Sequence, residues 1–140
     1  MSAGVLSGAA VALRRAIHHA LAADAALTAA LGGARIHDVP PAAPDFPYVT
    51  LGEAQVLDWS TATEAGAEHR LTLACWSRQG GHGEAHGLAH LVQQALHDAP
   101  LTLEGHRLVN LRMSAAEIRR EPGGRTYRAL LRFRAVTEAA

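Results

Sequence analysis

The sequence predicts an α+β fold in which an antiparallel sheet of about four strands carries two main helices on one face. Three observations lead to this expectation. Apolar residues recur at helical spacing in two regions, alternating strand-like segments come in two pairs, and each pair encloses a turn or loop. The expected order of elements is α-β-β-α-β-β, folded as a single domain over residues 1–140.

The first helix is indicated by apolar residues that recur every three or four positions from Leu6 to Leu21. Asp24 is placed to cap a short second helical segment over residues 25–31. Gly32 is suited to end that segment, because glycine adopts the left-handed conformation of a helix end at little cost.

A long hairpin is predicted from two strands at residues 48–57 and 69–76. The second strand alternates strictly, with Cys75 on its apolar face. The loop between them, residues 58–67, is longer than the roughly two to five residues common in hairpins, and apart from Trp59 it is mostly polar. A loop of this length in a small domain often carries function.

The last third contains the second main helix and a closing hairpin. Apolar residues at helical spacing mark the helix over residues 88–99, which Pro100 ends. Two strands at residues 107–120 and 125–137 flank a proline- and glycine-rich turn at residues 121–124. On the final strand, apolar and arginine-bearing positions alternate between the two faces.

Composition excludes several classes of protein. The chain has 13 basic residues, all of them arginine, and 13 acidic ones, so its formal net charge is zero. This balance argues against DNA or an anionic membrane as the main partner. A single cysteine allows no internal disulfide, and the N-terminus lacks the pattern of a signal peptide. These two observations lead us to expect a chain that is cytoplasmic when made. No apolar stretch is long enough to span a membrane.

Three histidines could in principle hold a metal ion, since His82, His86 and His90 are spaced one helical turn apart. Glu84, however, lies one position away from where a metalloprotease pattern places its base. We therefore favour a polar helix flank over a metal site. Cys75 is expected to be a buried apolar residue rather than a nucleophile. No other catalytic or phosphate-binding motif is present, so no enzyme activity, cofactor or metal is expected.

The long loop supplies the first candidate interface, formed by Asp58, Trp59, Ser60 and Thr61. An indole at a loop tip offers a large apolar area at low entropic cost. The alternative is that Trp59 folds back onto the sheet.

A second candidate interface is a stripe of arginines on the final strand, formed by Arg128, Arg132 and Arg134 and joined by Arg112 or Arg120 from the partner strand. Arginine binds carboxylate and phosphate equally well. Because the net charge is zero, we favour ion pairing within the chain, or a contact between subunits, over nucleic-acid binding.

Several segments together resemble one protein family. The chain is similar to the tail-completion proteins, or tail terminators, of long-tailed phages and gene transfer agents over about residues 10–138. The likeness rests on the order of these segments: Phe46-Pro47-Tyr48-Val49-Thr50-Leu51-Gly52, Asp58-Trp59-Ser60-Thr61, Glu68-His69-Arg70, Ala74-Cys75-Trp76-Ser77 and Leu131-Arg132-Phe133-Arg134.

This resemblance implies a structural protein with helices packed on an antiparallel sheet. It implies a homohexameric ring on the last ring of the tail tube, where the ring stops tube growth and offers its other face to the head-tail connector or neck protein. The partners would then be further copies of the chain, the tail tube protein and the neck protein, with DNA only passing through the channel and no membrane contact. The protein would end in the tail or neck of a phage-like particle, and the hairpin over residues 48–76 would be an arm that reaches a neighbouring subunit.

Two alternatives of other classes stay open from the sequence. One is a small ligand-binding or regulatory α+β domain, which would show an apolar pocket. The other is a metal-dependent hydrolase that uses His82, His86 and His90, which would bind metal in stoichiometric amount.

Overall fold

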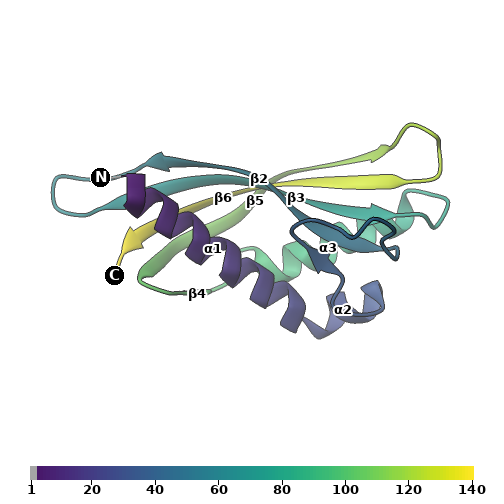
Figure 1. The fold of residues 1–140 in the computed structure, drawn as a ribbon, viewed down its shortest axis with the longest axis horizontal. Coiled ribbons are helices and arrows are strands. Elements are labelled where there is room, and N and C mark those ends of the chain that lie inside the picture. The colour runs from purple at the N-terminus through teal and green to yellow at the C-terminus, as the bar shows by residue number, and fades with distance from the viewer. Residues whose placement is uncertain (1–2) are drawn as a thin grey trace.

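The computed structural model describes residues 3–140, which form three helices and six strands (Figure 1). The four long strands lie next to one another in a single sheet of order β1-β2-β3-β6-β5-β4. All three helices lie on one face of this sheet, and the other face is free of helices. The elements are α1 (Ala3–Ala23), α2 (Ala25–Leu31), β1 (Ile36–His37), β2 (Tyr48–Asp58), β3 (Gly66–Ser77), α3 (Gly83–Leu96), β4 (Thr102–Leu103), β5 (His106–Arg120) and β6 (Tyr127–Ala139).

The α+β class and the placement of the helices on one face are confirmed, but the predicted sheet was incomplete. It has six strands within residues 3–140, and it is mixed because β1 pairs in parallel with β2. The two additional strands, β1 and β4, are two residues long each. An alternating pattern cannot be recognised over only two residues. The position of β1 also depends on a hydrogen bond to another part of the chain, in which the Val49 N–H donates to the Arg35 carbonyl over 2.9 Å.

The short helix α2 forms where its capping residues predict it. The Leu27 N–H donates to the Asp24 carboxylate over 2.9 Å at the start of the helix. Gly32 ends it in the left-handed conformation with a φ of 80°. Together with the two main helices, this short helix brings the number of helices in residues 3–140 to three.

Both predicted hairpins are present, although their strand ends differ from those expected. The strands β2, β3 and β5 are longer, and β6 lies two residues further toward the C-terminus. The loop between β2 and β3 is residues 59–65 rather than 58–67, because Asp58 pairs with Ala67. The pairing of β2 with β3 shifts between Leu51 and Ala54, next to Gly52. A Cβ at Gly52 would lie 2.6 Å from the Thr72 hydroxyl, so only glycine fits this close approach.

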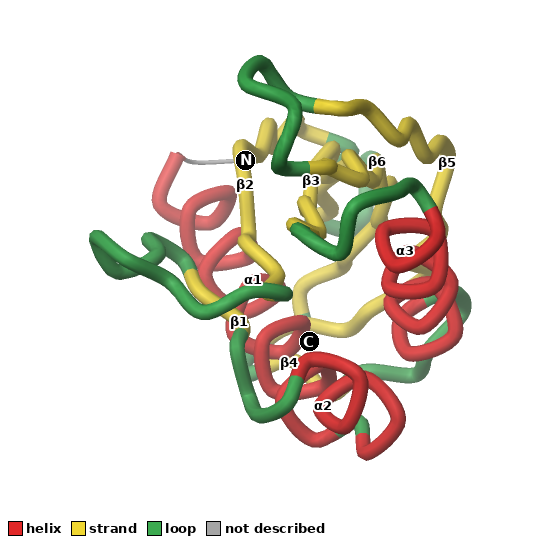
Figure 2. The backbone as a smooth tube through the Cα atoms, turned by 90° about the vertical axis from the view of Figure 1, so that its right-hand side faces the viewer, coloured by secondary structure: helices red, strands yellow, loops and turns green. Residues whose placement is uncertain are grey.

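The core lies between one face of the sheet and the helices, which Figure 2 shows with α1 at the left of the strands, α3 at the right and α2 below. Cys75 is in this core and completely buried. Burial raises the pKa of its thiol to about 12, which keeps it protonated and makes it an apolar packing residue, as expected. None of the helices in residues 3–140 is both long and apolar enough to cross a bilayer. The largest fully buried side chains include Ile17, Leu21, Leu73, Leu88, Leu111, Leu131 and Phe133.

Candidate assembly surfaces

The loop between β2 and β3 is ordered by its own hydrogen bonds. The Trp59 N–H donates to the Gly66 carbonyl over 2.9 Å, and the Thr61 N–H donates to the Glu64 carbonyl over 2.9 Å. The Ser60 N–H donates to the Asp58 carboxylate over 3.0 Å. Hydrogen bonding from the Ser60 side chain, and then from its backbone, lowers the pKa of the Asp58 carboxyl. These bonds order the backbone of the loop that carries Trp59.

Trp59 is 54% exposed and lies at the rim of a shallow hollow. The guanidinium carbon of Arg134 lies 5.4 Å from the centre of the indole ring, a cation–π contact. Val109, on β5, also lines the hollow and is 50% exposed. The loop therefore does not bury its tryptophan in the core, and two exposed apolar side chains lie side by side at this end of the sheet.

Replacing Trp59 by alanine is expected to change the free energy of unfolding by less than about 1 kcal/mol, because the indole is more than half exposed. Assembly into particles should be impaired. Thermal denaturation of the purified chain and electron microscopy of particles carrying the variant measure the two effects. A large fall in the melting temperature or in solubility would show instead that the indole supports the core.

The arginine stripe lies on the helix-free face of the sheet, and it is broader than predicted. Arg70, Arg134 and Arg112 form one row across β3, β6 and β5, because Arg134 is paired with both of the others. Arg132 follows on β6, and beyond it Arg128 pairs with Arg119. The face therefore carries these six arginines from three strands.

The expectation that Arg120 could join the stripe was wrong, while Arg112 does join it. The pairing of β5 with β6 shifts between Met113 and Ala115, which inserts one residue. An inserted residue exchanges the faces of all positions beyond it, so Arg119 replaces Arg120 on the stripe. Arg120 pairs with Tyr127 on the helix side, and its guanidinium donates to the Gly124 carbonyl over 3.2 Å.

Most of these arginines meet a carboxylate of the same chain, as the zero net charge led us to expect. Glu68 lies between two of them and is 5% exposed. Its oxygens are 2.6 Å from Arg134 and 3.3 Å from Arg70. The remaining pairs are Arg112 with Asp98, Arg119 with Glu117, and Arg128 with Glu121, the last a 2.9 Å contact without hydrogen-bond geometry.

Arg132 is the exception within residues 3–140, because its exposed side chain has no carboxylate within ion-pair distance. Arg128 also faces an aromatic ring, since its guanidinium carbon lies 5.8 Å from the centre of Trp76. Arg132 is thus the member of the stripe that is open to an acidic group from another chain.

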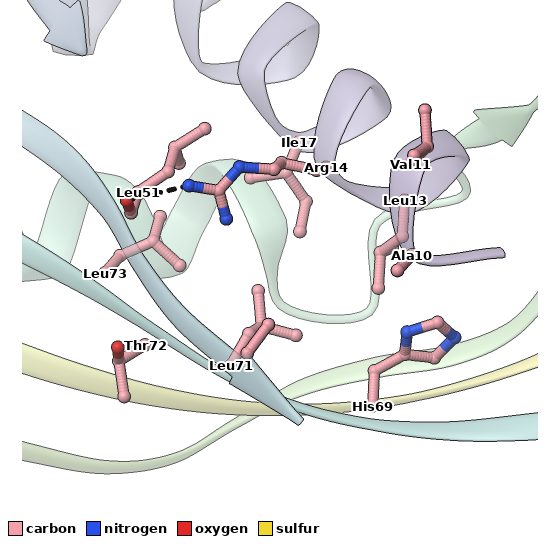
Figure 3. Close-up of a pocket in the computed structure, with 11 residues that line it drawn as sticks. Ala10, Val11, Leu13, Arg14, Ile17, Leu51, His69, Leu71, Thr72 and Leu73 are labelled. Carbon is pink, nitrogen blue, oxygen red and sulfur yellow. Dashed lines mark hydrogen bonds between the residues drawn. The ribbon is translucent and has the colours of Figure 1, made fainter. Parts of the chain in front are cut away.

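An apolar pocket lies between α1 and the strands β2 and β3 (Figure 3). Its volume is about 150 Å³, below the range of roughly 300–1,000 Å³ typical of small-molecule sites. Arg14 crosses one side and donates to the carbonyls of Leu51 and Gly52 over 2.9 and 3.1 Å. The pocket therefore gives no support to the small-ligand alternative, although it leaves room for an aliphatic side chain.

His69 borders this pocket and is 2% exposed. Its Nε2 lies 2.9 Å from the Thr137 hydroxyl on β6. Burial, and then the nearby His106, lowers the pKa of His69 to about 4, so the imidazole is neutral at pH 7. Sequence reasoning did not identify this buried polar pair, because its two members are 68 positions apart in the chain.

His86 and His90 on α3 and His82 at its N-cap are exposed, as a polar helix flank requires. His82 packs against the ring of Tyr127, with ring centres 4.8 Å apart. Throughout the described part of the chain, no three histidine, cysteine or acidic side chains gather in a way that could hold a metal ion.

The comparisons with known proteins identify the family. Residues 15–138 match the sequence model of the family described as Tail completion protein gp17. The chain belongs to this family. It is therefore a structural tail-completion protein and not an enzyme, and the resemblance found in the sequence is confirmed.

A solved structure supports the same family. This tail-completion protein is 37% identical to a chain in the structure described as the virion of a native gene transfer agent (GTA) particle. The match covers 93% of this chain and 97% of the other, with a TM-score of 0.85. No curated protein matches the chain significantly.

Besides the His69–Thr137 pair, two features of this tail-completion protein were missed in the sequence. Arg70 belongs to the arginine stripe although it lies on the central hairpin. Alternation in β3 places it opposite the apolar face, but its position beside Arg134 follows only from the pairing of β3 with β6. The pocket between α1 and the sheet was missed because it depends on how the helix crosses the strands.

Proposed function

We propose that this protein is a tail terminator that forms a ring on the last ring of the tail tube of a phage-like particle. The ring ends polymerisation of the tube and offers its other face to the head-neck complex. Residues 1–140 act as one domain, and the ring is a hexamer of identical copies. DNA passes through its channel, and no reaction is needed.

The observation that carries this proposal is the close match to a chain of a gene transfer agent virion, at 37% identity over nearly the whole of both chains. The family match over residues 15–138 supports it independently. The structure is compatible with a ring subunit, because heterologous contacts between identical chains close into a cycle when their rotation allows.

We assign the two candidate interfaces to contacts within the ring or with the tail tube and neck proteins. The first is the loop that presents Trp59, whose exposed indole is suited to a partly apolar contact. The second is the arginine stripe, in which Arg132 is available to a partner's carboxylate. The full set of assigned residues is Asp58, Trp59, Ser60, Thr61, Arg128, Arg132 and Arg134.

Negative-stain electron microscopy of particles from a producer strain that lacks this gene tests the proposal. We expect tails of irregular length that are detached from filled heads. The same strain supplied with an intact copy of the gene is the control and should restore tailed particles of uniform length. Normal tailed particles in the absence of the gene would contradict the terminator function.

A further inference from the structure

The long strands at the two sides of the sheet have outer edges that no strand covers over much of their length. On β2, the parallel strand β1 pairs only with Val49 and Thr50, and Arg14 bonds the next two carbonyls. Residues 54–58 have an uncovered outer edge within the described chain. Uncovered strand edges are sites where another chain can add a strand.

The outer edge of β5 is free in the same way. The short strand β4 pairs only with His106 and Arg107. The segment after α3 covers the next part, because the Asp98 N–H donates to the Leu111 carbonyl over 2.8 Å. Residues 114–120 carry no further strand in the part of the chain that the structure describes. Neither free edge contains proline, which would remove a backbone donor from the edge.

The directions of the strands allow the two edges to pair with each other. The neighbours β2, β3, β6 and β5 are all antiparallel, so β2 and β5 run in opposite directions at the two sides of the sheet. A second copy, rotated about an axis along the strands, would therefore place its β2 antiparallel to the β5 of the first. Such a contact uses two different surfaces and can be repeated around a ring.

The side chains at these edges are complementary. On the helix side, Val56 and Ile118 are both partly buried aliphatic residues, and Ala54 also lines the pocket beside α1. The charges differ in sign, since residues 54–58 contain one acidic residue, Asp58, and no basic one. Residues 114–120 contain Arg119 and Arg120 against the single Glu117.

We propose that a second copy of this chain docks at the β2 edge, where its residues 114–120 add antiparallel to residues 54–58 and bring Ile118 next to Val56. This contact rests on the proposed ring and describes how its subunits join. Repeated from copy to copy, it continues the sheet of each subunit into the sheet of the next. The acidic β2 edge selects the basic β5 edge over a second β2 edge.

Disulfide cross-linking tests this contact, using a variant with Gln55→Cys and Arg119→Cys. These two positions lie on the helix-free side and face each other when Val56 is opposite Ile118. A second variant, Leu57→Cys with Glu117→Cys, examines the adjacent pair in the same register. The native Cys75 is completely buried with a pKa of about 12, so it does not interfere. Both the purified chain and purified particles are oxidised and examined by non-reducing electrophoresis.

We expect a ladder of cross-linked species from dimer upward that disappears on reduction. The matched control is Gln55→Cys with Gln94→Cys, which places the second thiol on an exposed position of α3 away from the edge. The inference is overturned if both edge variants remain monomeric in both samples while their thiols react with maleimide. A strain whose tails are normal but whose subunits do not cross-link would contradict edge pairing alone and leave the terminator function intact.

Discussion

Replacing Phe133 by alanine is expected to lower the free energy of unfolding by about 3–5 kcal/mol. Phe133 is 2% exposed and lies on β6, between its partners Leu71 and Met113 on the two neighbouring strands. Truncation removes apolar contacts and leaves a cavity, which the residues around a central strand cannot easily move to fill. The loss is a large part of the roughly 5–15 kcal/mol that stabilises a typical domain.

Urea denaturation of the purified variant measures this loss. The matched control is Val109→Ala, an apolar truncation on β5 at a residue that is 50% exposed, where we expect a change within about 0.5 kcal/mol. An equal effect of the two substitutions would contradict the placement of Phe133 in the core.

Lowering the pH from 7 to 4 is expected to remove about 3 kcal/mol of stability through His69 alone. The pKa of His69 is lowered from its ordinary 6.5 to about 4 by burial and by the neighbouring His106. Between these two values the unfolded chain binds a proton that the folded chain does not. Stability is therefore fully present above pH 6.5 and is lost as the pH falls toward the folded pKa.

Urea denaturation at several pH values between 4 and 7 measures this effect. The variant His69→Gln keeps a polar group that can bond Thr137 but does not titrate, so its stability should depend less steeply on pH. His90→Gln, at an exposed position of α3, is the control and should keep the pH dependence of the natural chain. Parallel pH profiles for the natural chain and His69→Gln would show that the imidazole is not the source.

The elements that could be predicted are those with long periodic patterns. The helix α1, the helix α3 and the two hairpins each repeat their apolar positions often enough to show a period. The cap at Asp24 and the stop at Gly32 were also predictable, because they depend on single residues with specific backbone roles. Two-residue strands such as β1 leave no period to detect.

The surfaces were less predictable, because they depend on register. One inserted residue near Ser114 decides that Arg119, and not Arg120, joins the arginine stripe. No local pattern in the sequence marks that insertion. The exposure of Trp59 was likewise open, since a loop tryptophan can lie on the sheet or project from it, and the sequence does not distinguish the two.

Because the two tryptophans have different surroundings, the intrinsic fluorescence of the chain can report on each of them separately. The indole of Trp76 is stacked on Tyr48 and donates a hydrogen bond to Thr50, whereas that of Trp59 is 54% exposed and lies beside Arg134. A water-soluble quencher such as acrylamide reaches the second far more readily than the first. Fluorescence can therefore follow events at the tip of the β2–β3 hairpin without any attached dye, while the emission of Trp76 serves as an internal reference.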